Sequence, residues 1–370
     1  SKSDYVPLLG GLSIFLDTTI EEFTQDFQLK RTFESSDLTL GLFYSKKFSF
    51  NYNDNQILWN LYPVAIESIN SMDYPDEVVA LSAKYNYYVD DTFIFTAGFR
   101  YQESKREFER NLNNFGAEPT QANASDKWKK FLPLLSLSYI TDDNAHLYLS
   151  YSKGMRTGGY NYRSDDTLTP YKAQITDGYE LGYKRDFGNG LKLNTALFYN
   201  DIKDMRVVTF EDTLATFLTN APKAYSYGFE LDMSYQQDGL LIYGSLGLAR
   251  AKYDSLMIDG VDYSGNTIID TPNATASLGL KYDFSESLYL NASLSYMGKR
   301  YYNASNSAVE EGYTVSNLSI GYKDNGWEVE LYGKNIFDSE YVDFMIATPS
   351  NSYYHFGTPR VVGVKISKDF

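Results

Sequence analysis

The chain has 370 residues, with 33 Lys and Arg against 48 Asp and Glu, and its formal net charge of −15 argues against nucleic-acid binding. It has no cysteine, only two histidines and no long apolar run, which excludes a disulfide scaffold, a thiolate metal site and a membrane-spanning helix. Its 35 Tyr, 23 Phe and three Trp leave a membrane β-barrel open, because barrel strands place apolar residues only at every second position.

Alternation of apolar and polar residues with a period of two is the main secondary-structure signal. In 191–200, Leu191, Leu193 and Leu197 fall on one face while Lys192 and Asn194 fall on the other. Segments of this kind are long enough to cross a membrane as tilted strands. The sequence predicts fifteen strands, near 20–33, 37–50, 77–89, 92–106, 129–140, 145–155, 173–186, 191–205, 223–236, 240–253, 272–284, 288–302, 313–323, 327–344 and 358–370.

The connections between these strands alternate in length. Short polar turns, such as 188–190 and 237–239, alternate with longer stretches, such as 156–172, 254–271 and 345–357. Short turns on one rim and long loops on the other are the plan of a bacterial outer-membrane barrel. We therefore predict an all-β fold, a transmembrane antiparallel β-barrel with short periplasmic turns and long extracellular loops. A soluble β-sandwich or propeller is the alternative, but its strands are usually about half as long.

The strand count bears on what precedes residue 1. If residue 370 ends at the periplasmic rim, fifteen strands place the start of the first strand outside, whereas bacterial barrels have an even number of strands. We therefore expect further strands to precede residue 1. Residues 5–18 offer the alternative, because as a sixteenth strand they would close a smaller, passive porin-like channel.

An ordered series of motifs resembles the TonB-dependent outer-membrane receptors. Residues 147–161 (LYLSYSKGMRTGGYN) look like their "YxSYSxGFRxGGYN" stretch, and 179–184 (YELGYK) look like "YELGxK". Near the end, 333–341 (GKNIFDSEY) resemble "NLFDxxY" and 357–364 (GTPRVVGV) resemble "GxPRxxGV". The chain ends in Phe370, which the resemblance identifies as the assembly signal of such barrels. The resemblance runs from about residue 23 to residue 370.

The resemblance implies a barrel of 22 strands preceded by a plug domain and a TonB box, neither of which is visible in 1–370. Residues 1–370 would then be one domain, the C-terminal part of the barrel, with about fifteen of the 22 strands. The family imports scarce nutrients, most often ferric siderophores, across the outer membrane of Gram-negative bacteria, driven by the TonB complex. The implied partners are the ferric chelate as cargo, TonB, outer-membrane lipid and the barrel assembly machinery. Neither a resident cofactor nor an enzymatic activity is expected.

Two loop clusters are candidate ligand sites, because aromatic rings and cations can orient an iron chelate. Arg156, Tyr160, Tyr162 and Arg163 form the first, and Tyr353, Tyr354, His355 and Arg360 form the second. The alternative is that these residues belong to the outer interfacial belt and to packing between loops. Few arginines in the loops and the charge of −15 argue against a strongly anionic ligand.

Alternation also places five carboxylates on the inner face of the barrel. A receptor would use them to contact its plug, and a porin would use them to line a water channel. These lumen-facing residues are Glu180, Glu230, Asp232, Glu328 and Glu330. The scarcity of histidine argues against haem, but siderophore, cobalamin and glycan receptors stay open. No metal-binding or hydrolase motif is present in the sequence.

Overall fold

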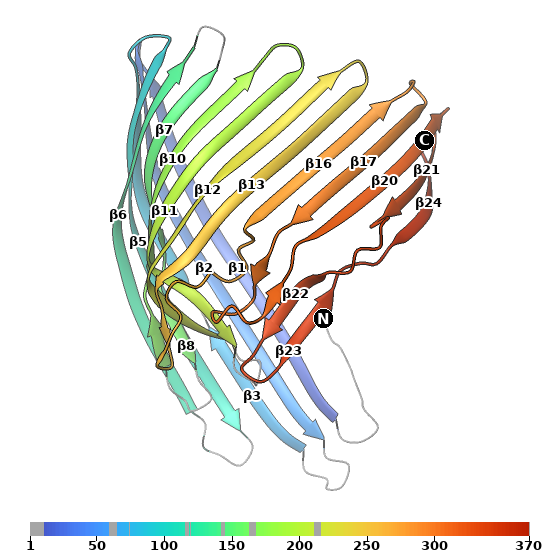
Figure 1. Cartoon of the computed structure of the whole chain (residues 1–370). Coiled ribbons are helices and arrows are strands. Elements are labelled where there is room, and N and C mark those ends of the chain that lie inside the picture. Colours follow the sequence, from blue (N-terminus) through green and yellow to red (C-terminus); the bar gives the residue numbers. More distant parts are fainter. Residues whose placement is uncertain are drawn as a thin grey trace. The chain divides into compact units, whose positions relative to one another are not determined.

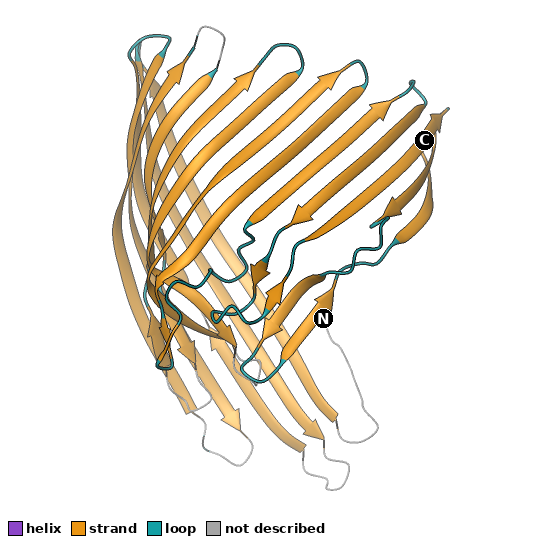
Figure 2. Cartoon of the chain, in the orientation of Figure 1, coloured by secondary structure: helices purple, strands orange, loops and turns teal. Residues whose placement is uncertain are grey.

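The computed structural model describes residues 11–58, 65–73, 75–114, 118, 120–141, 145–162, 168–210 and 216–369. Throughout these ranges the regular elements are β-strands joined by turns and loops, as Figure 2 shows. None of the described residues belongs to a helix that could cross a membrane. The fold class is therefore all-β, as the alternation predicts.

One large antiparallel sheet contains the long strands (Figure 1). Its members are β1 (Gly11–Thr32), β2 (Ser36–Leu58), β3 (Ala65–Asp73), β4 (Asp76–Tyr88), β5 (Phe93–Asn114), β6 (Thr120–Ile140), β7 (His146–Arg156), β10 (Gln174–Asp186), β11 (Leu191–Phe210), β12 (Thr216–Gln237), β13 (Leu240–Ser255), β16 (Ala274–Asp283), β17 (Leu288–Met297), β20 (Tyr313–Asp324), β21 (Trp327–Lys334) and β24 (Val361–Lys368).

Strands that follow one another along the chain pair within this sheet, in the order β1-β2-β3-β5-β6-β7-β10-β11-β12-β13-β16-β17-β20-β21-β24, while β4 pairs with β2 and β5. Four two-stranded hairpins lie in the long connections. They are β8 (Gly159–Tyr162) with β9 (Leu168–Tyr171), β14 (Met257–Ile258) with β15 (Val261–Asp262), β18 (Arg300–Tyr301) with β19 (Val309–Glu310), and β22 (Val342–Ala347) with β23 (Ser352–Phe356).

Each of the fifteen predicted strands has a counterpart in the sheet, but several boundaries were wrong. The strands β2, β5 and β6 are longer than predicted, and β3 lies between two predicted strands. The strand expected at 327–344 ends at Lys334, because Asn335 and Asp338 adopt left-handed backbone angles of φ 46° and 56°. The strand expected at 288–302 ends at Met297. Residues 11–18 are the beginning of β1 and pair with β2, so they are not a separate strand. Residues 5–10 lie outside the described residues, and with them part of the proposed sixteenth strand.

The chain divides into two compact units, and each is described by itself. Unit 1 contains residues 1–86, 97–133 and 155–174, and unit 2 contains 87–96, 134–154 and 175–370. The expectation that 1–370 form one domain stays a prediction.

The strands of unit 2 have two different faces. On one face, Leu181 lies opposite Leu197 in the register of β10 and β11, and both side chains are about half exposed, at 43% and 53%. On the other face, Glu180 lies opposite Phe198. Hydroxyl and amide side chains on this second face bond across strands, as between Ser245 and Ser277 at 2.7 Å. An exposed apolar face backed by a polar and aromatic face is what a lipid-embedded sheet requires.

Candidate functional site

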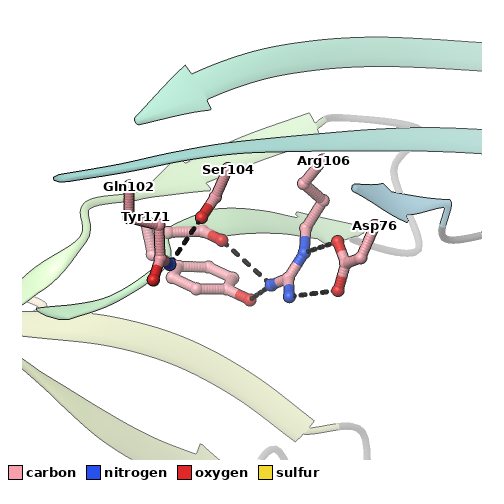
Figure 3. Close-up of polar contacts among 6 residues, drawn as sticks. Asp76, Gln102, Ser104, Arg106 and Tyr171 are labelled. Carbon is pink, nitrogen blue, oxygen red and sulfur yellow. Dashed lines mark hydrogen bonds and ion pairs between the residues drawn. The ribbon is translucent and has the colours of Figure 1, made fainter. Parts of the chain in front are cut away.

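The first candidate loop, 157–173, joins β7 to β10 and is hydrogen-bonded to Arg106 of β5 (Figure 3). The loop and Arg106 both belong to unit 1. The Arg106 guanidinium binds both carboxylate oxygens of Asp76, with Nη2 at 2.6 Å from Oδ2. Its Nη1 donates to the Gly158 carbonyl at 2.9 Å and to the Tyr171 hydroxyl at 3.3 Å. A planar guanidinium with five donors can serve a carboxylate and a loop backbone at once. Arg106 therefore connects the start of β4 to both ends of the β8–β9 hairpin.

Gly158 permits the close approach on which this arrangement depends. A Cβ at position 158 would lie 2.4 Å from the Tyr171 carbonyl oxygen and 2.8 Å from the ring of Trp128. Because the nearest atom belongs to the backbone, a larger residue would push the base of the hairpin apart. The loop is thus closed at its base by a glycine and an arginine.

The structure describes the side chains of two of the four predicted ligand residues of this loop, Arg156 and Tyr160. Arg156 is exposed at the end of β7. Tyr160 is half-buried, and its ring lies 6.5 Å from that of Phe108, which is only 1% exposed. Arg163 and the side chain of Tyr162 lie outside the described residues. The Tyr160 ring thus lies beside a buried phenylalanine of β5, and its role toward a ligand stays a prediction.

The second candidate loop carries the β22–β23 hairpin in unit 2. Tyr353 and Tyr354 are about half exposed, at 46% and 52%, and the Tyr354 ring stacks on Phe356 at a centroid distance of 6.2 Å. The imidazole of His355 is exposed, with Nδ1 at 3.6 Å from an Asp343 carboxylate oxygen. Three of the four predicted residues thus share one short hairpin.

Arg360 lies apart from the hairpin, just before β24. Its backbone N–H donates to Oδ1 of Asp338 at 2.8 Å, and its guanidinium lies 3.8 Å from the second oxygen of that carboxylate. Nearby, the buried amide of Asn335 donates to the carbonyls of Ser339 and Thr358. Arg360 and Asn335 therefore both make contacts that join the two ends of the long loop 335–360.

The five acidic residues predicted to line a lumen lie on the face opposite the exposed apolar side chains. Glu180 accepts a hydrogen bond from Tyr148 at 2.5 Å, and Glu328 accepts one from Tyr289 at 2.7 Å. Glu180 and Glu230 border a hollow of about 290 Å³ that Ser150, Ser152 and Asn200 also line. Glu330 borders a larger hollow of about 880 Å³. Their role toward a plug or a channel stays a prediction, as does that of Phe370, which lies outside the described residues.

Two arginines that bind these loops were missed by the sequence analysis. Arg106 and Arg300 are partly or wholly buried and bind loop backbone. Arg106 contacts Asp76, Gly158 and Tyr171, which are separated from it by 30, 52 and 65 positions in the sequence. No local motif could therefore reveal its role. In the described part of the chain, no group of three or more His, Asp or Glu side chains is placed to hold a metal ion.

Comparison with known proteins gives consistent results. A family model, "TonB dependent receptor-like, beta-barrel", matches residues 3–336. The ferrioxamine receptor of Yersinia enterocolitica is 28% identical over 283 residues, covering 73% of this chain and 37% of that receptor. The ferrichrome outer membrane transporter/phage receptor of Escherichia coli K12 is 25% identical over 358 residues, covering 88% and 46%. The chain therefore spans less than half the length of these relatives.

Solved structures share the fold. The ferric yersiniabactin uptake receptor FyuA of Yersinia pestis superposes with a TM-score of 0.82 at 19% identity, covering 97% of this chain and 55% of that one. At this level of identity the likeness concerns the fold alone.

Proposed function

The chain belongs to the TonB dependent receptor-like, beta-barrel family of Gram-negative outer-membrane proteins, and we propose that it forms the barrel and the outer loops of a receptor that imports a ferric siderophore. The observation that carries this proposal is the contrast between the two ends of the unit 2 strands. Short turns close one end, whereas the other end bears long loops that are packed together and expose aromatic side chains on a hairpin.

The exposed hairpin has the chemistry that an iron chelate needs. A ferric siderophore is a compact chelate with apolar and polar surfaces. It could contact the rings of Tyr354 and Phe356 on one face of β23, or the ring of Tyr353 and the imidazole of His355 on the other. The net charge of −15 disfavours a strongly anionic chelate. Among the relatives, a ferrioxamine receptor, a ferrioxamine B receptor and a ferrichrome transporter match along most of this chain, which makes ferrioxamine B the first ligand to try.

The proposal includes the energy source and the partners. The chelate would bind at the outer loops and pass through the lumen once the TonB complex, acting on another part of the full-length protein, rearranges a plug. The chelate is cargo, so no resident cofactor and no catalysis is required. Outer-membrane lipid would cover the apolar face, and the barrel assembly machinery would insert the barrel.

A passive channel is the main alternative. It required residues 5–18 as a separate strand, and residues 11–18 instead continue β1. Haem, cobalamin and glycan receptors are alternatives within the same family. Such a receptor would share the barrel and the energy source proposed here and would differ only in the ligand that it binds.

Equilibrium binding tests the proposal. Purified full-length protein is titrated with ferrioxamine B while its tryptophan fluorescence is followed, with cobalamin and haem as competitors. We expect a saturable signal with a Kd of about 1 µM or lower. Tyr353→Ala combined with Tyr354→Ala should weaken binding about tenfold or more, as expected for aromatic contacts at a ligand site. Phe337→Ala, which removes an even more exposed ring (75%) outside the hairpin, should leave the Kd unchanged. No saturable binding, or displacement by cobalamin or haem, would refute the siderophore assignment.

A further inference from the structure

Arg300 lies buried where three extracellular connections meet in unit 2. It is the first residue of β18 and is 9% exposed. Its Nη1 lies 3.2 Å from an oxygen of Asp270, and its Nη2 donates to the carbonyls of Val342 and Asp343 at 3.1 and 2.9 Å. The guanidinium also lies 5.0 Å from the ring centroid of Tyr302. One side chain therefore contacts the connection before β16, the loop 298–312 and the start of β22.

The start of the β22–β23 hairpin is held by further contacts to loop 298–312. The Val342 N–H donates to Glu310 Oε1 at 3.2 Å, and the Tyr302 hydroxyl donates to the Val342 carbonyl at 3.4 Å. Tyr302, Val342 and Met345 form a small buried apolar cluster. Both backbone polar groups of Val342 are therefore used to attach the hairpin to this loop.

Loop 298–312 is itself fixed to the connection between β13 and β16. The Asn306 side chain bonds both backbone groups of Thr267: its Oδ1 accepts from the N–H at 2.8 Å, and its Nδ2 donates to the carbonyl at 2.9 Å. The Asn266 amide donates to the carbonyl of Ala304, and the Asp270 N–H donates to the carbonyl of Tyr301. Loop 298–312 is thus attached to the β13–β16 connection by hydrogen bonds that do not involve the hairpin.

The buried contacts of the hairpin lie on β22, whereas the side chains of β23 are exposed. β22 and β23 pair only with each other and form a sheet separate from the large one. Tyr353, Tyr354 and Phe356 are about half to two-thirds exposed, at 46%, 52% and 68%. A ligand gains full affinity from such rings only if their position is set before binding, because ordering them afterwards costs entropy.

We propose that Arg300 is the positioning residue of this receptor's outer ligand surface: it fixes the base of the β22–β23 hairpin against the two preceding loops, so that the hairpin's aromatic side chains are held ready for the ligand. The ligand part of this inference rests on the proposed function. The structural part, that Arg300 restrains the hairpin, does not.

Hydrogen exchange of the full-length protein tests the restraint without any ligand. In Arg300→Met the side chain keeps its apolar length but no longer donates to the carbonyls of Val342 and Asp343, although the Tyr302 hydroxyl still donates to the Val342 carbonyl. We expect amides of 342–356 to exchange about tenfold faster or more, while those of β16 and β17 stay unchanged. Lys299→Met is the matched control, because Lys299 is adjacent but its ammonium pairs with the exposed Glu311, at 2.7 Å, and lies over the ring of Tyr301 within its own loop. Unchanged exchange of 342–356 in Arg300→Met would overturn the proposal.

A second variant guards against a general folding defect. Arg300→Lys keeps the charge, but a single ammonium cannot reproduce the forked contacts to two carbonyls and a carboxylate. We expect it to show hairpin exchange between that of the wild type and that of Arg300→Met, with normal heat-modifiable gel mobility. If the amides of 342–356 exchange at the wild-type rate in Arg300→Lys, the forked contacts of the guanidinium are not needed to restrain the hairpin.

Binding of ferrioxamine B tests the link to the ligand. We expect Arg300→Met to raise the Kd about tenfold while the maximal import rate at saturating ligand stays unchanged, because the lumen and plug are unaffected. In the Arg300→Met background, Tyr354→Ala should add little, because residues that act as one unit give non-additive effects. Fully additive effects would overturn the positioning role. If the wild type fails to bind ferrioxamine B, the proposed function fails, and the exchange measurement still decides whether Arg300 restrains the hairpin.

Discussion

Tyr289 of β17 lies across Gly321 of β20, its direct partner in the register. A Cβ at position 321 would fall 2.2 Å from Cζ of the tyrosine ring, and the hydroxyl beyond it donates to Glu328 of β21 at 2.7 Å. The ring therefore covers the glycine and reaches the next strand. The same relationship recurs on this face for Phe198 over Gly228, Tyr243 over Gly279 and Tyr332 over Gly363.

Gly321→Ala should therefore destabilise the sheet although it adds one methyl group. The tyrosine would have to leave its position, which removes the hydrogen bond to Glu328 and costs about 1–3 kcal/mol as overpacking. The midpoint of heat-induced loss of the folded gel band reports this change. Gly154→Ala is the control, because a Cβ there meets no atom within 4 Å. Equal midpoints for the two variants would contradict the account.

Arg106→Met should release the loop 157–173. Breaking the partly buried pair with Asp76 and the bond to the Gly158 carbonyl should cost locally about 3 kcal/mol. Trypsin applied to intact cells should then cut this loop, for example after the exposed Lys172, faster than in the wild type. Lys127→Met removes only an exposed pair with Glu103 and should leave the cleavage rate unchanged. A rate unchanged in Arg106→Met would show that the loop does not depend on this arginine.

Leu197→Arg should impair assembly, whereas Asn194→Arg should be tolerated. Leu197 lies on the apolar exposed face, where a cation at the middle of the bilayer costs about 2–4 kcal/mol. Asn194 lies on the opposite face of the same strand. The amount of folded protein in isolated outer membranes measures the difference. Equal amounts of the two variants would argue that the two faces have been assigned wrongly.

Alkaline pH should weaken the attachment of the β22–β23 hairpin. Burial raises the pKa of Tyr302 to about 12, with Asp270 and Glu310 reinforcing the shift and Arg300 opposing it. A phenol whose pKa is raised on folding contributes stability below its ordinary pKa of about 10, and this contribution is lost as the pH rises toward 12. Exchange of amides 342–356 should therefore accelerate, beyond its intrinsic pH dependence, above pH 10. Tyr302→Phe should lack this added acceleration. If the acceleration persists in Tyr302→Phe, ionisation of a group other than Tyr302 causes it.

The sequence predicts the sheet well because alternation is a local property. Leu197 and Phe198 fall on opposite faces whatever their partners are, so both the strand and its orientation follow from a few residues. The end of β21 was missed because Asn335 turns the chain through side-chain bonds to Ser339 and Thr358, which alternation does not encode.

The loop contacts could not be predicted for a related reason. Arg300 acts through Asp270 and Val342, which lie 30 and 42 positions away in segments without a period. Tyr160 and Tyr354 are the same residue type in similar loops, yet one packs near buried Phe108 and the other is about half exposed. Only tertiary structure separates these two cases.

The most direct test of the receptor assignment is import of radioactive iron from ferrioxamine B. The full-length protein is expressed in a Gram-negative strain that lacks its own ferrioxamine receptors, with and without a functional TonB complex. The account predicts saturable import that disappears when TonB is deleted or the proton-motive force is collapsed. Import that rises linearly with concentration and persists without TonB would contradict it and identify a passive channel.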